Sequence, residues 1–146
     1  MNMIRKATHN DLARIAEIFV FNYRLHFYPI FRNDDFYFTE LQVPAVMEQM
    51  KSSIDRTWVY DDGTVKGFIQ TNGKEVCRLF VEPVLQSQGI GGALLTFAVD
   101  DQHVNMLWAL EKNTRAIHFY ECYGFHVTPD RKPEPETSEF LVRMER

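Results

Sequence analysis

Residues 75–95 read EVCRLFVEPVLQSQGIGGALL, and this stretch decides the fold. Its first part is rich in β-branched and aromatic residues that favour a strand, and Pro83 ends the strand because proline cannot donate to a ladder. Gly89, Gly91 and Gly92 then precede a helix-forming Ala-Leu-Leu run. Because glycines leave the N–H groups of the first helical turn open, and the helix dipole is positive there, this turn can hold a phosphate.

Several phosphate-binding motifs compete for this loop. A Walker loop requires a Lys after the glycines, and none follows them; a dinucleotide fingerprint requires a third glycine where Leu94 stands. The pattern that fits is Gln86-x-x-Gly89-x-Gly91, placed after a strand and a proline. It resembles the acetyl-CoA loop of the GNAT superfamily of N-acetyltransferases, Q/R-x-x-G-x-G/A after a bulged strand. The alternative is an ordinary glycine-rich strand-to-helix turn.

The length, composition and net charge of the chain limit the class of protein it can be. A chain of 146 residues with 45% hydrophobic and 25% charged residues is expected to form one globular domain, residues 1–146. A net charge of -4 argues against general affinity for nucleic acid. The N-terminus lacks the apolar core of a signal peptide, and no apolar run reaches membrane-spanning length. Cys77 and Cys122 need no oxidising compartment, so a cytoplasmic protein without membrane contact is expected.

The remaining pattern predicts a mixed order of elements. A stripe of Leu12, Ile15, Ile18 or Phe19, and Asn22 at helical spacing indicates a helix over residues 9–26, which Tyr28-Pro29 is expected to stop. The other predicted segments are strands at 3–7, 57–60, 65–69, 105–110, 125–128 and 139–144, helices at 44–54, 90–103 and 113–123, and a loop at 129–136. Such an order favours an α+β fold over a doubly wound parallel sheet.

Residues 30–43 are both aromatic and acidic. One interpretation is a loop or irregular helix whose aromatic side chains fill the core. The other is a wall of the acceptor site, where Asp34, Asp35 and Glu40 attract a cationic amine. Both interpretations remain open from the sequence.

A second motif supports the first. The pattern Asn113-x-x-Ala116-x-x-Phe119-Tyr120, followed by Gly124-Phe125, is similar to a GNAT segment that lies one helix and one strand beyond the cofactor loop. The resemblance covers nearly the whole chain and is vague at residues 28–56. It implies the GNAT fold: a mixed, mostly antiparallel central sheet of about six to seven strands, flanked by about four helices, with a splayed central strand.

The resemblance implies transfer of an acetyl group from acetyl-CoA, as co-substrate, to a primary amine of a small molecule or a protein, by direct attack in a ternary complex. The N–H groups near Phe80 and Val81 would stabilise the oxyanion. The residues expected to bind the cofactor are Leu79, Phe80 and Val81 on the strand, Gln86, Ser87, Gln88, Gly89, Ile90, Gly91 and Gly92 in the loop, and Asn113, Ala116 and Phe119 on the following helix.

The same resemblance assigns Tyr120 as the acid that protonates the departing thiolate. Because roughly one lysine amine in a thousand is free base at pH 7, the enzyme must also accept a proton. Glu75 is the predicted base, with Glu111 and a water chain as competitors. A non-catalytic acyl-CoA-binding or sensing module, and transfer of a longer acyl group, are alternative functions.

Two further features are weaker. His118 and Cys122 lie four residues apart, but no second pair at ligand spacing accompanies them, so no metal is predicted. Homodimers are common in the family, and the last strand, residues 139–144, is expected to offer an exposed edge for one.

Overall fold

The computed structural model describes residues 3–146 and contains a seven-stranded sheet in the order β1-β2-β3-β4-β5-β7-β6. Neighbouring strands are antiparallel except β4 and β5, which are parallel. The strands are β1 Ile4–Lys6, β2 Thr57–Asp61, β3 Val65–Asn72, β4 Glu75–Val81, β5 Met106–Leu110, β6 His126–Pro133 and β7 Phe140–Glu145. The helices are α1 Leu12–Asn22, α2 Tyr28–Phe31, α3 Val43–Met50, α4 Ile90–Gln102 and α5 Thr114–Cys122. The predicted α+β class and mixed sheet are confirmed.

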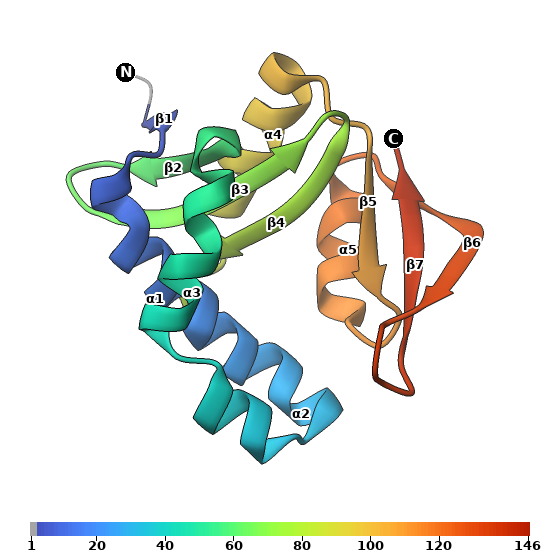
Figure 1. Ribbon diagram of the computed structural model, residues 1–146. Coiled ribbons are helices and arrows are strands. Elements are labelled where there is room, and N and C mark those ends of the chain that lie inside the picture. The colour runs from blue at the N-terminus through green and yellow to red at the C-terminus, as the bar shows by residue number, and fades with distance from the viewer. Residues whose placement is uncertain (1–2) are drawn as a thin grey trace.

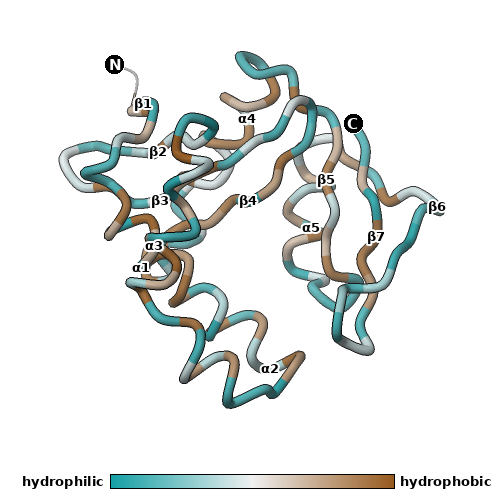
Figure 2. The backbone as a smooth tube through the Cα atoms, in the orientation of Figure 1, coloured by the Kyte–Doolittle hydropathy of each residue, from teal (hydrophilic) through white to brown (hydrophobic). Residues whose placement is uncertain are grey.

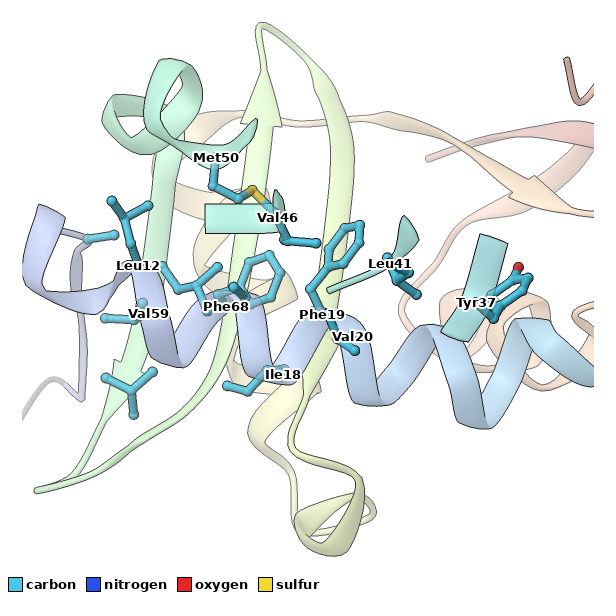
Figure 3. Close-up of a cluster of buried hydrophobic side chains, with 14 residues drawn as sticks. Leu12, Ile18, Phe19, Val20, Tyr37, Leu41, Val46, Met50, Val59 and Phe68 are labelled. Atoms are coloured by element: carbon cyan, nitrogen blue, oxygen red, sulfur yellow. The ribbon is translucent and has the colours of Figure 1, made fainter. Parts of the chain in front are cut away.

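Helices cover both faces of the sheet and bury two cores (Figure 1). On one face α1 and α3 pack on the strands, and Figure 3 shows Phe19, Val46 and Phe68 meeting between these layers. On the other face the apolar side of α4 packs against the strands through fully buried Leu94 and Leu95. The central strands of the sheet therefore pack against helices on both faces.

The central strand β4 is bulged and splayed. Its register against β3 shifts so that Arg78 pairs with Gln70 while Val76 pairs with Thr71, which leaves Cys77 as the extra residue. Against β5, β4 pairs at its first two residues, Glu75 and Val76, and then diverges, as Figure 1 shows. The predicted splayed strand is confirmed, and the divergence opens a gap in the middle of the sheet.

The first helix is longer than predicted. A π-helical turn at Tyr23–Phe27 follows α1, and α2 continues through Pro29 to Phe31, so the predicted stop at Tyr28-Pro29 is wrong. In the π-helical turn the Tyr28 N–H bonds to the Tyr23 carbonyl, five residues back. This wider turn just before Pro29 lets the helix pass a residue that has no N–H to donate.

The C-terminal hairpin also differs from prediction. The expected loop at 129–136 is wrong in its first part, because β6 runs through Pro133. Pro129 lies in an irregularity between Val127 and Arg131, and β6 is an edge strand, where proline is tolerated. The last strand, β7, lies between β5 and β6, so it offers no exposed edge for a dimer. None of the helices within residues 3–146 combines the length and apolar character that crossing a membrane requires.

Candidate active site

A cavity of about 520 Å³ lies where β4, the glycine loop and α5 meet. Its walls contain every residue predicted to bind the cofactor except Gln88. The predicted residues on its walls are Leu79, Phe80, Val81, Gln86, Ser87, Gly89, Ile90, Gly91, Gly92, Asn113, Ala116 and Phe119. Asn113 also caps α5, because its side chain accepts a hydrogen bond from the Ala116 N–H at 3.2 Å. The two sequence motifs therefore lie on facing walls of one cavity.

The glycine loop presents backbone donors to this cavity. Gly89 precedes α4 in a left-handed conformation, with φ 84°, which favours glycine. The Ala93 N–H bonds to the Gly89 carbonyl at 3.0 Å, so the N–H groups of the preceding residues 90–92 lie in the first turn, where α-helical acceptors are lacking. Together with the Arg115 guanidinium on the same cavity wall, these donors fit a pyrophosphate.

Gly91 and Gly92 differ in the space that the structure leaves for a side chain. A Cβ on Gly91 would lie 3.4 Å from the Phe119 ring, in ordinary contact. A Cβ on Gly92 would lie 2.7 Å from Cζ of Tyr123, so it would overlap the ring. Although both residues line the cavity, Gly92 is required for the close packing of α4 against α5.

A buried asparagine joins α1 to the glycine loop, and sequence reasoning missed it. Asn22 is 2% exposed, and its Nδ2 donates to the carbonyls of Ile18 and Val81, at 2.8 Å each. Its Oδ1 accepts a hydrogen bond from Gln86 Nε2 at 3.0 Å. The signal was present, because Asn22 is a polar residue in an otherwise apolar stripe. Asn22 fixes both the end of β4 and the first residue of the loop motif.

His26 and Arg115 extend this network to the surface, and neither was predicted. The Arg115 guanidinium lies 3.0 Å from His26 Nε2 and also donates to the Gln86 side-chain oxygen. Burial lowers the pKa of His26, Arg115 lowers it further, and the Gln86 hydrogen bond opposes them. A neutral imidazole is therefore favoured, which can accept a hydrogen bond from Arg115.

A second cavity, of about 660 Å³, opens between the π-helical turn, β4, β5 and the loop after β6. Aromatic side chains from residues 30–43 do line it, including Phe31, Phe36 and Tyr37. The acidic residues of that segment, Asp34, Asp35 and Glu40, do not line it and are exposed to solvent. The carboxylates on its walls are instead those of Glu75, Glu134 and Glu136. The last two belong to the hydrophilic connection between β6 and β7, which is teal in Figure 2.

The two cavities share a wall, and Tyr120 stands on it. The residues common to both are Phe27, Leu79, Phe80, Asn113, Ala116 and Tyr120. The Tyr120 ring packs edge-on against Phe119 and Phe125, with centroids 5.3 and 5.9 Å away. Burial raises the pKa of Tyr120, so the phenol stays protonated at neutral pH. A protonated hydroxyl at this junction can donate to a group in either cavity.

The two candidate bases, Glu75 and Glu111, lie in different surroundings. Glu111 forms a two-point ion pair with Arg131, with both N–O distances 2.9 Å, and Arg131 lowers its pKa. Glu111 lines neither of these cavities, whereas Glu75 lines the second.

His118 and Cys122 lie on the wall of the first cavity, with Nε2 of His118 3.9 Å from Sγ of Cys122. Within residues 3–146, no group of three or more potential ligands could hold a metal ion.

Comparison with known proteins finds acetyltransferases. The family model of the acetyltransferase (GNAT) domain matches residues 53–127. The peptidyl-lysine N-acetyltransferase YiaC of Escherichia coli K12 is 30% identical over 128 residues, which cover 86% of this chain and 84% of that protein. The peptidyl-lysine N-acetyltransferase YjaB of Salmonella typhimurium is 34% identical over 70 residues, 48% of each chain.

A solved structure shares the fold. The PaiA N-acetyltransferase of Thermoplasma acidophilum, crystallised with coenzyme A, superposes with a TM-score of 0.76 at 20% identity over 98% of both chains. The chain belongs to the GNAT family of acetyltransferases. It is an acetyl-CoA-dependent N-acetyltransferase, as its two motifs predict.

Proposed function

We propose that this enzyme acetylates the side-chain amine of lysine in peptides or proteins, by direct attack on acetyl-CoA in a ternary complex. The observation that carries the proposal is the pair of cavities that share the wall bearing Tyr120 and Phe80. Two separate cavities allow cofactor and acceptor to be bound together and to meet at that wall. The names of the YiaC and YjaB relatives support lysine as the acceptor.

The backbone of β4 supplies the oxyanion donor in this proposal. The Glu82 N–H bonds to the Lys66 carbonyl of β3 at 2.9 Å. Because bonding alternates along an antiparallel pair, the Val81 backbone points away from β3, into the splayed gap. The Asn22 amide already occupies the Val81 carbonyl, which leaves the Val81 N–H for the developing oxyanion. The same open side of the strand is available to pair with the pantetheine arm.

The remaining cofactor contacts follow from the first cavity. The N–H groups at the start of α4, with Gln86 and Ser87 in the loop, hold the pyrophosphate, whereas Gln88 lies outside the cavity. Asn113, Ala116 and Phe119 line the pantetheine. Acetyl-CoA supplies the thioester, and the residues of the chain orient its carbonyl against the Val81 N–H.

Tyr120 is the proposed general acid. Its protonated hydroxyl can donate to the thiolate that leaves the acetyl group. A thiol of this kind has an ordinary pKa of about 8.5. Glu75 is the proposed base, acting through water. Glu75 lines the second cavity, where the acceptor would bind, but it lies six positions before Val81 on β4, roughly 20 Å at the usual rise, so we expect no direct contact with the attacking amine.

Three broader expectations from the sequence remain predictions. These are that residues 1–146 form one domain, that it works in the cytoplasm without nucleic acid or membrane, and that it forms a homodimer. A dimer that pairs sheet edges would use β1 or β6, the edge strands of the described sheet.

The test is acetylation of a panel of acceptors, followed by thiol release and by mass spectrometry of the product. The panel contains lysine peptides, matched peptides with Nε-acetyl-lysine, polyamines and free amino acids. We expect lysine peptides to gain one acetyl group on Nε and the blocked peptides to gain none. Turnover with small amines alone would refute the peptide acceptor. Tight binding of acetyl-CoA without turnover on any acceptor would favour the sensing module instead.

A further inference from the structure

The second cavity, which is the acceptor cavity of the proposed function, contains charged side chains of both signs that form no ion pairs in the described part of the chain. Five charged side chains line it: Glu75, Arg78, Lys132, Glu134 and Glu136. Within residues 3–146, none of the five forms an ion pair with another side chain. Glu75, Arg78 and Glu134 are partly buried, whereas Lys132 and Glu136 are exposed to solvent. Charged groups that lose part of their contact with water are normally paired, so the three partly buried ones suit a ligand that supplies the opposite charges.

Arg78 is the cation that is held in place. The bulge at Cys77 turns its side chain toward α1, where the guanidinium carbon lies 5.3 Å from the centre of the Phe19 ring. Its Nη1 donates to Oε1 of Gln70 at 2.6 Å, and Gln70 is itself 1% exposed. A guanidinium has five N–H donors in a planar fork, so this anchored group keeps donors for a carboxylate.

The charge of Arg78 also acts on the hydroxyl of Tyr23, another residue of the acceptor cavity. Burial raises the pKa of the Tyr23 hydroxyl, and the nearby Arg78 lowers it, while Glu134 raises it again. Arg78 on β4 and Glu134 in the loop after β6 both line the cavity with Tyr23, and both shift the pKa of its hydroxyl. A ligand here meets a cation on β4 and a carboxylate on the loop after β6.

Lys132, the other cation that lines the acceptor cavity, is less suited to bind a carboxylate. It lies on the exposed edge strand β6, and its ammonium is 4.2 Å from the centre of the Trp108 ring, which occupies it in a cation–π contact. An ammonium is also a point charge without the fork geometry of a guanidinium. Arg78 is therefore the better carboxylate anchor of the two.

The position of Arg78 links it to the transferred group. Arg78 and Phe80 are two residues apart on β4 and both face α1, so their side chains leave the strand roughly 7 Å from one another. Phe80 stands on the wall shared with the cofactor cavity. A carboxylate bound by Arg78 thus lies close enough to the reacting amine to belong to the same molecule.

We infer that the acceptor carries a carboxylate beside its reactive amine, and that Arg78 binds this carboxylate. In a peptide the group is an acidic side chain flanking the target lysine, which rests on the function proposed above. A free amino acid has the same chemistry, and the experiment separates the two sources.

The test compares kcat/KM for peptides that differ in the residues flanking one lysine, Asp or Glu against Asn or Gln. A second matched pair is free lysine against 1,5-diaminopentane, which has the same amine without the carboxylate. We expect the wild-type enzyme to favour the acidic peptides by about tenfold, mainly through KM, as for a charge-assisted hydrogen bond. Arg78→Gln should abolish the preference, and Arg78→Lys should retain part of it.

The control is Arg32→Gln, which removes the same charge from an exposed residue next to the lining residue Phe31 without touching the cavity wall. Its preference should match the wild type, and acetyl-CoA affinity should be unchanged in all variants. Equal rates on acidic and neutral acceptors in both pairs, or a preference that survives Arg78→Gln, would overturn the inference.

The outcomes also separate this inference from the proposed function. An Arg78-dependent preference for free lysine over 1,5-diaminopentane, with no peptide acetylated, would refute the peptide acceptor and keep Arg78 as the anchor. Acetylation of all peptides at one rate would keep the function and refute the anchor. If Arg78→Gln does not fold, the comparison of acceptors with wild-type enzyme and with Arg78→Lys still decides.

Discussion

Two neighbouring glycines in the cofactor loop should respond in opposite ways to the same added methyl group. Gly91→Ala places a Cβ 3.4 Å from the Phe119 ring, in normal contact, whereas Gly92→Ala places it 2.7 Å from Cζ of Tyr123. Helix propensity favours alanine by about 1 kcal/mol at either position and so cancels between them. The difference in the free energy of unfolding is then the steric term, about 2 kcal/mol, with Gly92→Ala the less stable.

The measurement is urea unfolding followed by circular dichroism, with both variants and the wild type side by side. A difference of about 2 kcal/mol corresponds to roughly 6 °C in melting temperature for a chain of this size. Replacing Tyr123 by Leu should remove most of the penalty of Gly92→Ala, which a double-mutant cycle will show. Equal stability of the two alanine variants would refute the packing role assigned to Gly92.

Three further changes test the site. Gly91→Glu should abolish acetyl-CoA binding, measured by calorimetry, because it puts bulk and negative charge at the pyrophosphate donors; unchanged affinity would contradict the placement of the cofactor. Glu75→Gln should lower kcat by about tenfold or more, while Glu111→Gln leaves it within about twofold, and the reverse order would exchange the bases. The His26 pKa is depressed below 6.5, so the unfolded chain binds this proton more readily and stability falls as pH drops below 6.5. An NMR titration of His26 that gives a pKa of 6.5 or more would contradict this.

The parts of the fold that depend on local pattern could be predicted from the sequence. The strand, proline and glycines of residues 75–95 fix one cavity wall, and the Asn113 cap with its helix fixes the other. Both motifs are contiguous, so their chemistry is readable without knowing which distant segments touch. The same holds for the two short connections that join β2 to β3 and β3 to β4, residues 62–64 and 73–74, which contain the turn residues Gly63 and Gly73.

What could not be predicted depends on long-range contacts. Asn22 contacts Val81, and Arg115 contacts His26, across 59 and 89 residues of sequence. The helix passes Pro29 because a π-helical turn precedes it, and the hydrophobic periodicity of this segment does not signal that turn. Two of the three carboxylates on the acceptor cavity, Glu134 and Glu136, come from the loop after β6, whose position depends on how β7 inserts between β5 and β6.

The most direct test of the account is the effect of Tyr120→Phe on acetyl transfer, because the hydroxyl stands on the wall that both cavities share. The substitution removes one oxygen and keeps the ring contacts with Phe119 and Phe125. We expect the dissociation constant for acetyl-CoA to stay within about twofold, and kcat on a lysine peptide to fall by about a hundredfold. An unchanged kcat would show that Tyr120 is not the acid and that transfer does not depend on this junction.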